Sequence, residues 1–138
     1  MEAYKLKARE ILMLYEYVMS ETHDSSNAGV KDQDRFYLML ERPEKKLFGQ
    51  EQFPNVFEKA CVYLHSISND HIFINGNKRT AAYVFITYLE LHGITLTMTN
   101  KNLEDYVVEL TIHQKYKGND AIKNMYEDLR KFIDKIEL

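Results

Sequence analysis

The sequence is poor in the features that mark secreted and membrane proteins. It has a single cysteine, Cys61, so an internal disulfide bond cannot form. Its apolar runs are all shorter than the roughly 20 residues of a membrane-spanning helix. Residues 1–20 mix charged with apolar residues and lack the uninterrupted apolar segment of a signal peptide. We therefore expect a cytoplasmic protein without a membrane partner.

The chain also lacks an excess of positive charge. Its 18 lysines and arginines are outnumbered by 21 aspartates and glutamates, which gives a formal net charge of −3. Proteins that bind nucleic acid need a basic face toward the phosphates, so this balance gives no reason to expect direct contact with nucleic acid. With 138 residues, of which 45% are hydrophobic, residues 1–138 suit one domain with a buried core.

Apolar residues do recur at helical spacing along most of the chain, which predicts an all-α fold. We expect about six helices, over roughly residues 4–19, 36–40, 56–69, 80–92, 103–110 and 122–136. Pro54 suits the first turn of the third helix, and Gly93 suits the C-terminal cap of the fourth. Residues 95–100 have weak strand character but no evident partner. Pro43 and Gly49 disfavour a helix between the second and third, so a flap or irregular hairpin is expected there.

The most informative segment is HIFINGNKRTAAY, residues 71–83, which changes from polar to apolar where the fourth helix begins. The first N–H groups of a helix have no intrahelical acceptor, and the helix dipole adds positive charge there. Gly76 allows a tight bend, and Asn75 and Asn77 tolerate left-handed backbone. Lys78 and Arg79 add full positive charges. Together these residues predict a phosphate-binding loop.

Two more residues complete this prediction. His71 precedes the loop closely enough to accept a proton from a hydroxyl that attacks a bound phosphate. Phe73 is expected to point into the core and fix the loop. This pattern is typical of an enzyme that transfers a phosphate-containing group from a nucleotide to a hydroxyl.

The same residues also allow plainer interpretations. An Asn-Gly pair such as Asn75-Gly76 often forms a hairpin turn, but the helical pattern that follows argues against it. Lys78 and Arg79 could be solvated charges, although cations are disfavoured at a helix start without an anion nearby. Cys61 and His65 share a helix face, yet without further ligands a zinc site is improbable.

The segment HIFINGNKR resembles the signature of the Fic/Doc family, and more closely that of its death-on-curing (Doc) branch, H-x-F-x-D/N-A/G-N-K-R. The resemblance extends to AGVKDQDRFYLMLERP upstream and TAAYVFITYLELHG downstream, and covers roughly residues 20–95. It implies a compact helical domain in which His71 is the catalytic base. It also implies that Gly76, Asn77, Lys78 and Arg79 bind the phosphates of ATP, with Asn75 at the position that holds Mg²⁺ in the wider family.

The resemblance further implies a partner and a target. Residues 43–52 correspond to the family's flap, which pairs with a target peptide. Many Fic proteins inhibit themselves through a glutamate that is followed by glycine or asparagine, and no glutamate of this chain is. We therefore expect a toxin that is controlled by a cognate antitoxin and modifies a translation factor.

The resemblance leaves the transferred group open. The AMP-transferring pattern G-N-G-R-x-x-R has a second glycine and a final arginine where this chain has Lys78 and Ala82. A lysine can neutralise a terminal phosphate, so transfer of the γ-phosphate to a Ser or Thr hydroxyl is expected. AMP transfer is the first alternative. A catalytically silent protein-binding module is the second, because Asn75 replaces a carboxylate.

Overall fold

A computed structural model describes residues 3–135 of the chain. The α-helices of this part are α1 (Ala8–Glu21), α2 (Gln33–Glu41), α3 (Val56–Asn69), α4 (Asn77–Leu91), α5 (Asn100–Ile112) and α6 (Ala121–Leu129). Short 3₁₀ helices are η1 (Ser25–Asn27), η2 (Arg42–Glu44), η3 (Gln114–Tyr116) and η4 (Arg130–Phe132). The strands are β1 (Lys46–Leu47), β2 (Gln50–Glu51), β3 (Ile94–Leu96) and β4 (Ile133–Lys135). The predicted helical fold is confirmed.

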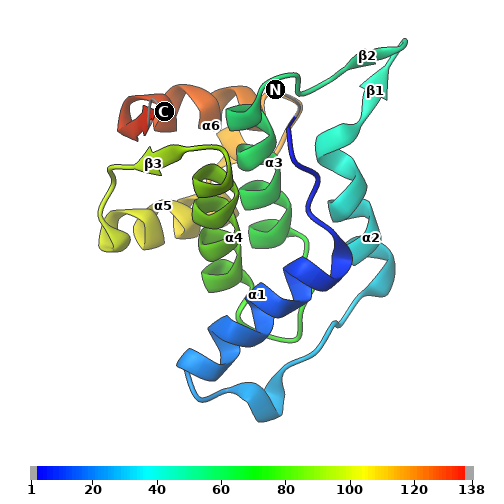
Figure 1. The fold of residues 1–138 in the computed structure, drawn as a ribbon, viewed down its shortest axis with the longest axis vertical. Helices are drawn as coiled ribbons and strands as arrows, with labels where there is room; N and C mark the ends of the chain where they lie inside the picture. The colour runs from blue at the N-terminus through cyan, green and yellow to red at the C-terminus, as the bar shows by residue number, and fades with distance from the viewer. Residues whose placement is uncertain (1–2, 136–138) are drawn as a thin grey trace.

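Helices α3 and α4 run side by side through the centre of the molecule, and the loop that joins them lies near α1 (Figure 1). Helix α3 is buried on most of its surface because α4, α5, α6 and η2 all pack against it. None of the described helices combines the length and the apolar composition that a bilayer crossing requires. The centre of the fold is thus the helix pair that flanks the HIFINGNKR segment.

Several helices begin at side-chain caps that the sequence encodes. The side-chain oxygens of Asp32, Asn55 and Thr99 each accept a hydrogen bond from a backbone N–H in the first turn of α2, α3 and α5. Asn55 is the cap of α3, so Pro54 lies just before the helix and not in its first turn. Gly93 follows the end of α4 with φ +70°, as expected for a residue beyond a C-terminal cap.

Both ends of the described chain differ from the helical prediction. Helix α1 begins at Ala8 and not at residue 4; Leu6 is buried, and its N–H donates to Tyr63 Oη. Helix α6 ends at Leu129, and residues 133–135 form β4, which pairs antiparallel with β3. The weak strand at residues 94–96 therefore has the partner that the sequence did not reveal. The predicted continuation of the last helix to residue 136 ends outside the described residues.

The hairpin β1–β2 is present between α2 and α3 as predicted, but it is not beside the HIFINGNKR loop. It precedes α3, whereas the loop follows α3, and Figure 1 shows the two at opposite ends of that helix. A helix of 14 residues is about 21 Å long. That residues 43–52 form a flap that pairs with a target peptide stays a prediction, and a peptide paired there would lie at the other end of α3 from His71.

Candidate active site at the start of helix α4

The loop between α3 and α4 is held in place by backbone pairing with the segment before α2. Val30 and Phe73 form an antiparallel β-bridge. The Ile74 N–H donates to the Gly29 carbonyl at 2.9 Å, and the Lys31 N–H donates to the Ile72 carbonyl at 2.8 Å. The two segments therefore fix each other although they lie some 40 residues apart in the chain.

Phe73 anchors this loop in the core, as the sequence predicted. Its side chain is 1% exposed and stacks on Tyr15 of α1 with ring centroids 3.9 Å apart. The ring of Phe36 meets it edge-on from α2. The Tyr15 hydroxyl in turn accepts a hydrogen bond from the Gly29 N–H at 3.0 Å. One aromatic stack thus joins α1, α2 and both paired segments.

The Asn77 side chain closes the loop on itself. Its Oδ1 accepts from the Phe73 N–H at 2.9 Å, and its Nδ2 donates to the Phe73 carbonyl at 3.0 Å. Both ends of the amide are therefore used inside the protein. Asn77 can contribute to anion binding through its backbone N–H, while its side chain keeps the loop in shape.

Gly76 is required at the turn for two independent reasons. Its φ is +75°, which disfavours residues with a side chain, and it is the residue that precedes the first turn of α4. A Cβ at this position would also lie 2.5 Å from Sδ of the buried Met19. Because α4 starts directly after Gly76, the alternative of an Asn-Gly hairpin is excluded.

The first turn of α4 has unpaired donors where the sequence predicts an anion site. In residues 3–135 the N–H groups of Asn77, Lys78 and Arg79 meet no protein acceptor, as expected at a helix start. The side chains of Lys78 and Arg79 are exposed. Arg79 lies 3.5 Å from Asp24, a carboxylate on the loop after α1. A bound phosphate would compete with this ion pair for the guanidinium.

His71 lies six residues before Asn77, the first residue of α4, and its side chain is exposed. Its φ of +51° turns the backbone sharply between α3 and the buried Ile72. The preceding Asp70 is fixed because its carbonyl accepts a hydrogen bond from Arg35 Nη1 at 2.9 Å. Burial raises the pKa of the Asp70 carboxyl, against the opposing effect of nearby Arg42. The His71 ring is thus carried by a constrained backbone while it stays open to a substrate.

The arrangement agrees with what comparison with known proteins finds. The model of the Fic/DOC family matches residues 5–89, more than half of the chain. The chain belongs to the Fic/DOC family. It is also 31% identical over 67 residues to a protein named Toxin Doc from Mycolicibacterium smegmatis, which covers 49% of this chain and 52% of that protein. The chain thus spans about half the length of this curated relative. No solved structure matches.

Asn75 occupies the acidic position of the wider Fic/DOC pattern. Its Oδ1 is buried, and within residues 3–135 it has no hydrogen-bond partner. An unpaired amide oxygen beside a phosphate site fits a ligand for a hard cation, although a carboxylate binds such cations more strongly. The residues present are therefore compatible with Mg²⁺.

An apolar groove of about 510 Å³ adjoins the Fic/DOC motif. It lies between α1, α4 and α5, and Lys78 and Arg79 form part of its wall. Tyr17 and Tyr83 stack within it at 5.2 Å between ring centroids. Any partner that fills this groove therefore contacts Lys78 and Arg79.

Several residues that shape the site were missed in the sequence. The spacing of Tyr15 and Met19 places them on one face of α1, but nothing in the pattern says that they pack under the loop. Asp24 lies in a polar segment that gives no local signal. Gly29 belongs to the upstream segment that resembles the family. Its pairing with Ile74 is a long-range contact that periodicity cannot predict.

Cys61 and His65 are both enclosed or bonded within the protein. Cys61 is fully buried, which raises the pKa of its thiol. His65 is bonded through Nδ1 to Arg42 and through Nε2 to the Tyr116 carbonyl. In the part of the chain that the structure describes, no three His, Cys, Asp or Glu side chains are grouped to hold a metal.

Proposed function

We propose that the protein is a Doc-like toxin that transfers the γ-phosphate of ATP to a Ser or Thr hydroxyl of a translation elongation factor, and so arrests growth. The observation that carries the proposal is the rigid loop between α3 and α4. It joins an exposed His71 to the start of α4, where the first N–H groups meet no acceptor within residues 3–135. The relative named Toxin Doc supports the toxin class.

The chemistry assigns one task to each group of residues. A neutral His71 ring takes the proton of the attacking hydroxyl, and the oxygen forms a bond to the γ-phosphorus. The bond from that phosphorus to the β–γ bridging oxygen breaks, and ADP leaves. The N–H groups of residues 77–79 and the charges of Lys78 and Arg79 hold the phosphates and neutralise their charge.

A magnesium ion is expected to bind with the nucleotide. Asn75 is the residue that would hold it, because its buried Oδ1 is unpaired among the described residues. The ion would reduce the repulsion between the phosphate oxygens and the incoming hydroxyl.

Which phosphate moves is decided with labelled ATP. Lys78 and Ala82 stand where AMP-transferring enzymes have glycine and arginine, so we expect the γ-phosphate to face His71. The purified protein is incubated with bacterial extract and ATP that carries the label at the α or the γ position. Label that enters a protein band only from γ-labelled ATP supports the proposal, whereas label only from α-labelled ATP shows AMP transfer.

The role of His71 is tested by induced expression of His71→Ala. Removal of a positioned base slows such a reaction by roughly 10²- to 10⁴-fold, so growth should recover. His113→Ala is the matched control, because His113 is also exposed and lies at the end of α5. Growth arrest by a soluble His71→Ala protein at wild-type level would refute the catalytic assignment.

The cognate antitoxin is proposed to fill the groove beside Lys78 and Arg79, because its occupant covers the phosphate loop. Val108→Asp places a charge in the wall of this groove, and Ile112→Asp places one on the same helix but not among the groove residues. We expect the antitoxin, identified in the genomic neighbourhood, to rescue cells that express Ile112→Asp but not Val108→Asp. Equal rescue of both would place the antitoxin elsewhere.

A further inference from the structure

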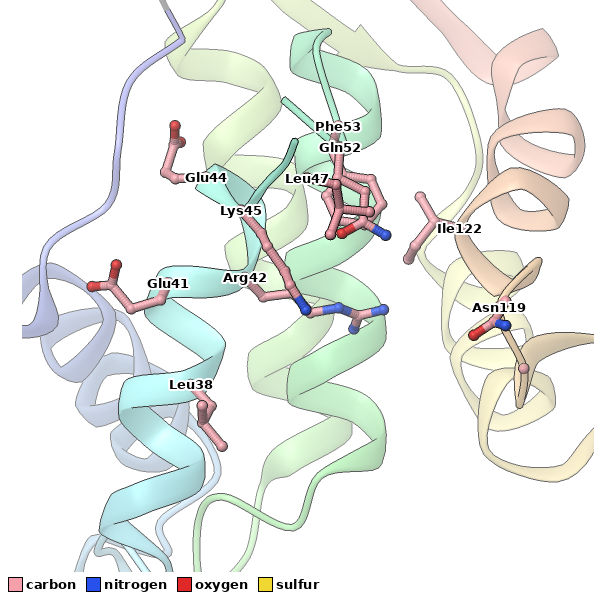
Figure 2. A pocket seen from close by; sticks show the side chains of 11 residues that line it. Leu38, Glu41, Arg42, Glu44, Lys45, Leu47, Gln52, Phe53, Asn119 and Ile122 are labelled. Carbon is pink, nitrogen blue, oxygen red and sulfur yellow. The ribbon is translucent and has the colours of Figure 1, made fainter. Parts of the chain in front are cut away.

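A second groove lies at the hairpin end of α3, away from the candidate active site. It has a volume of about 790 Å³ and lies between the end of α2 with the hairpin on one side and the start of α6 on the other (Figure 2). Volumes of this order hold a small ligand or a few residues of a peptide. Nothing in the proposed phosphate transfer uses this groove.

Arg42 is the charged centre of the groove. Its Nη1 donates to His65 Nδ1 at 2.9 Å and to Ser66 Oγ at 2.8 Å, which fixes the guanidinium against α3. The group is half-buried, yet within residues 3–135 no carboxylate lies within 4.0 Å of it. Figure 2 shows the side chain reaching across the face of α3 toward the side of the groove that carries Asn119. The donors that α3 does not use are therefore available to a ligand.

The acidic residues of the groove pair with lysines other than Lys45, and Asp70, which is not among the lining residues, interacts with Arg42 from beyond 4.0 Å. Glu41 is paired with Lys5 at 3.3 Å, and Glu44 shares the buried Lys59 with Glu51, at 3.4 Å and 3.0 Å respectively. Lys45 adds a second positive charge to the lining. Within residues 3–135, Arg42 and Lys45 have no carboxylate within 4.0 Å, so the side of the groove that carries them is complementary to a negatively charged group.

The rim and walls of the groove are apolar. Leu38 on α2 is 68% exposed and Leu47 on the hairpin is 48% exposed, and both line the groove. The buried Phe53 and Ile122 lie deeper in it. Large apolar side chains that stay in water around a polar centre are typical of surfaces that bind other proteins.

We propose that this groove docks an acidic peptide segment of a protein partner. A Glu or Asp carboxylate of the segment binds Arg42 as a forked, charge-assisted pair, and an apolar side chain beside it packs on Leu38 and Leu47. A peptide fits better than a small organic acid because the exposed leucines need apolar partners next to the carboxylate. The docking site is independent of phosphate transfer, since it lies at the other end of α3.

The test uses two capped peptides, acetyl-Gly-Leu-Glu-Leu-Gly-amide and the same peptide with Gln for Glu, and glutarate as a free acid. Titration into ¹⁵N- and methyl-labelled protein is expected to shift signals of Leu38, Ile122 and the Asn119 amide with the Glu peptide. The Gln peptide should bind at least about tenfold more weakly. Equal binding of both peptides, or glutarate binding as tightly as the Glu peptide, overturns the proposal, as does the absence of any shift.

Variants locate the contact. Asn119→Asp adds a repelling charge at an exposed position of the groove, and Asn27→Asp adds the same charge at an exposed position of η1 outside it. We expect Asn119→Asp to weaken binding of the Glu peptide at least about tenfold and Asn27→Asp to leave its affinity unchanged. Arg42→Lys keeps the positive charge but loses the forked guanidinium. Its affinity for the Glu peptide should lie between those of the Asn119→Asp and Asn27→Asp variants. If Arg42→Lys fails to fold, the comparison of Asn119→Asp with Asn27→Asp still tests the site. Equal affinity of these two variants for the Glu peptide refutes it.

Discussion

The segments at the two ends of α3 are held by different kinds of contact. At its C-terminal end, the loop is paired with residues 29–32, anchored by Phe73 and closed by the Asn77 amide. At its N-terminal end, the hairpin consists of two-residue strands whose side chains are exposed, with Phe48 fully in solvent at its tip. There the buried Lys59 connects α3 to η2 and to the hairpin, since its Nζ contacts the Pro43 carbonyl, Glu44 and Glu51.

This difference matches the tasks proposed for the two ends. Transfer of a phosphate requires groups that are held in one geometry, and a loop fixed by the backbone provides that. Docking of a partner tolerates an element that adjusts, and a short hairpin tied by side chains provides that. The predictions below compare the two ends directly.

The largest effect is expected from alanine at the two glycines with left-handed backbone. Gly76 (φ +75°) and Gly49 (φ +79°) have nearly the same conformation, but a Cβ meets Met19 at 2.5 Å in the first and nothing within 4 Å in the second. Gly49→Ala should cost about 1 kcal/mol of unfolding free energy for the backbone alone. Gly76→Ala should cost about 2–4 kcal/mol, because overpacking adds to the same strain.

Urea denaturation of both variants measures the difference. The matched backbone angles make Gly49→Ala the control for strain, so the excess loss in Gly76→Ala reports the close packing under the loop. Equal losses would mean that Met19 moves aside without cost and that the loop is less rigid than its contacts indicate.

The sequence was sufficient to predict the features that depend on local patterns. Helix periodicity located α2 to α5 well, and the bend at Gly76 before a buried helix followed from glycine and helix-end chemistry. The position of Phe73 in the core was also predicted correctly. The helices and the bend are determined by neighbours within a few residues, which a single sequence records.

Features that depend on distant contacts could not be predicted. Strand β4 forms by pairing with β3, which lies about 40 residues earlier in the chain. The apolar spacing of β4 also fits a helix, so the sequence pattern alone does not identify the strand. The hairpin was predicted, but its distance from His71 depends on the direction of α3. The burial of Lys59 on an apolar helix face could not be predicted either, because it depends on pairing with Glu44 and Glu51.

An intermediate effect is expected for Lys59→Met, which removes the link of the hairpin. Glu44 and Glu51 are partly exposed and can be hydrated, so the unfolding free energy should fall by less than the roughly 3–5 kcal/mol that is lost when a fully buried pair is broken. Hydrogen exchange should reveal a local change. The Gln52 N–H, bonded to the Lys45 carbonyl across the hairpin, should exchange faster, and the Ile74 N–H of the loop should not.

Lys101→Met serves as the control for loss of a lysine, since Lys101 forms an exposed pair with Asp105 on α5. It should leave both amides unchanged. If the Gln52 amide keeps its protection in Lys59→Met, the hairpin is held by other contacts and the contrast between the two ends of α3 is weaker than described.

The smallest effect concerns His65, which lies on α3 between the two ends. Burial lowers its pKa below the ordinary value of 6.5, because the charged ring would lose water and face Arg42. The folded state therefore binds this proton less readily than the unfolded state. Stability is fully present above pH 6.5 and falls as the pH drops from there toward the pKa of the folded state, by at most about 1.4 kcal/mol per pH unit for one proton.

His65→Gln should flatten this part of the stability profile, since an amide can keep a hydrogen bond without titrating. His113→Gln, at an exposed histidine, is the control and should keep the wild-type slope. Denaturation curves between pH 5 and 7 measure both. In the wild type, protonation would also remove the Nδ1 acceptor of Arg42, so the docking groove should lose order in this range while the His71 loop keeps it. A slope that survives His65→Gln would assign the titration to another group and separate Arg42 from the pH response.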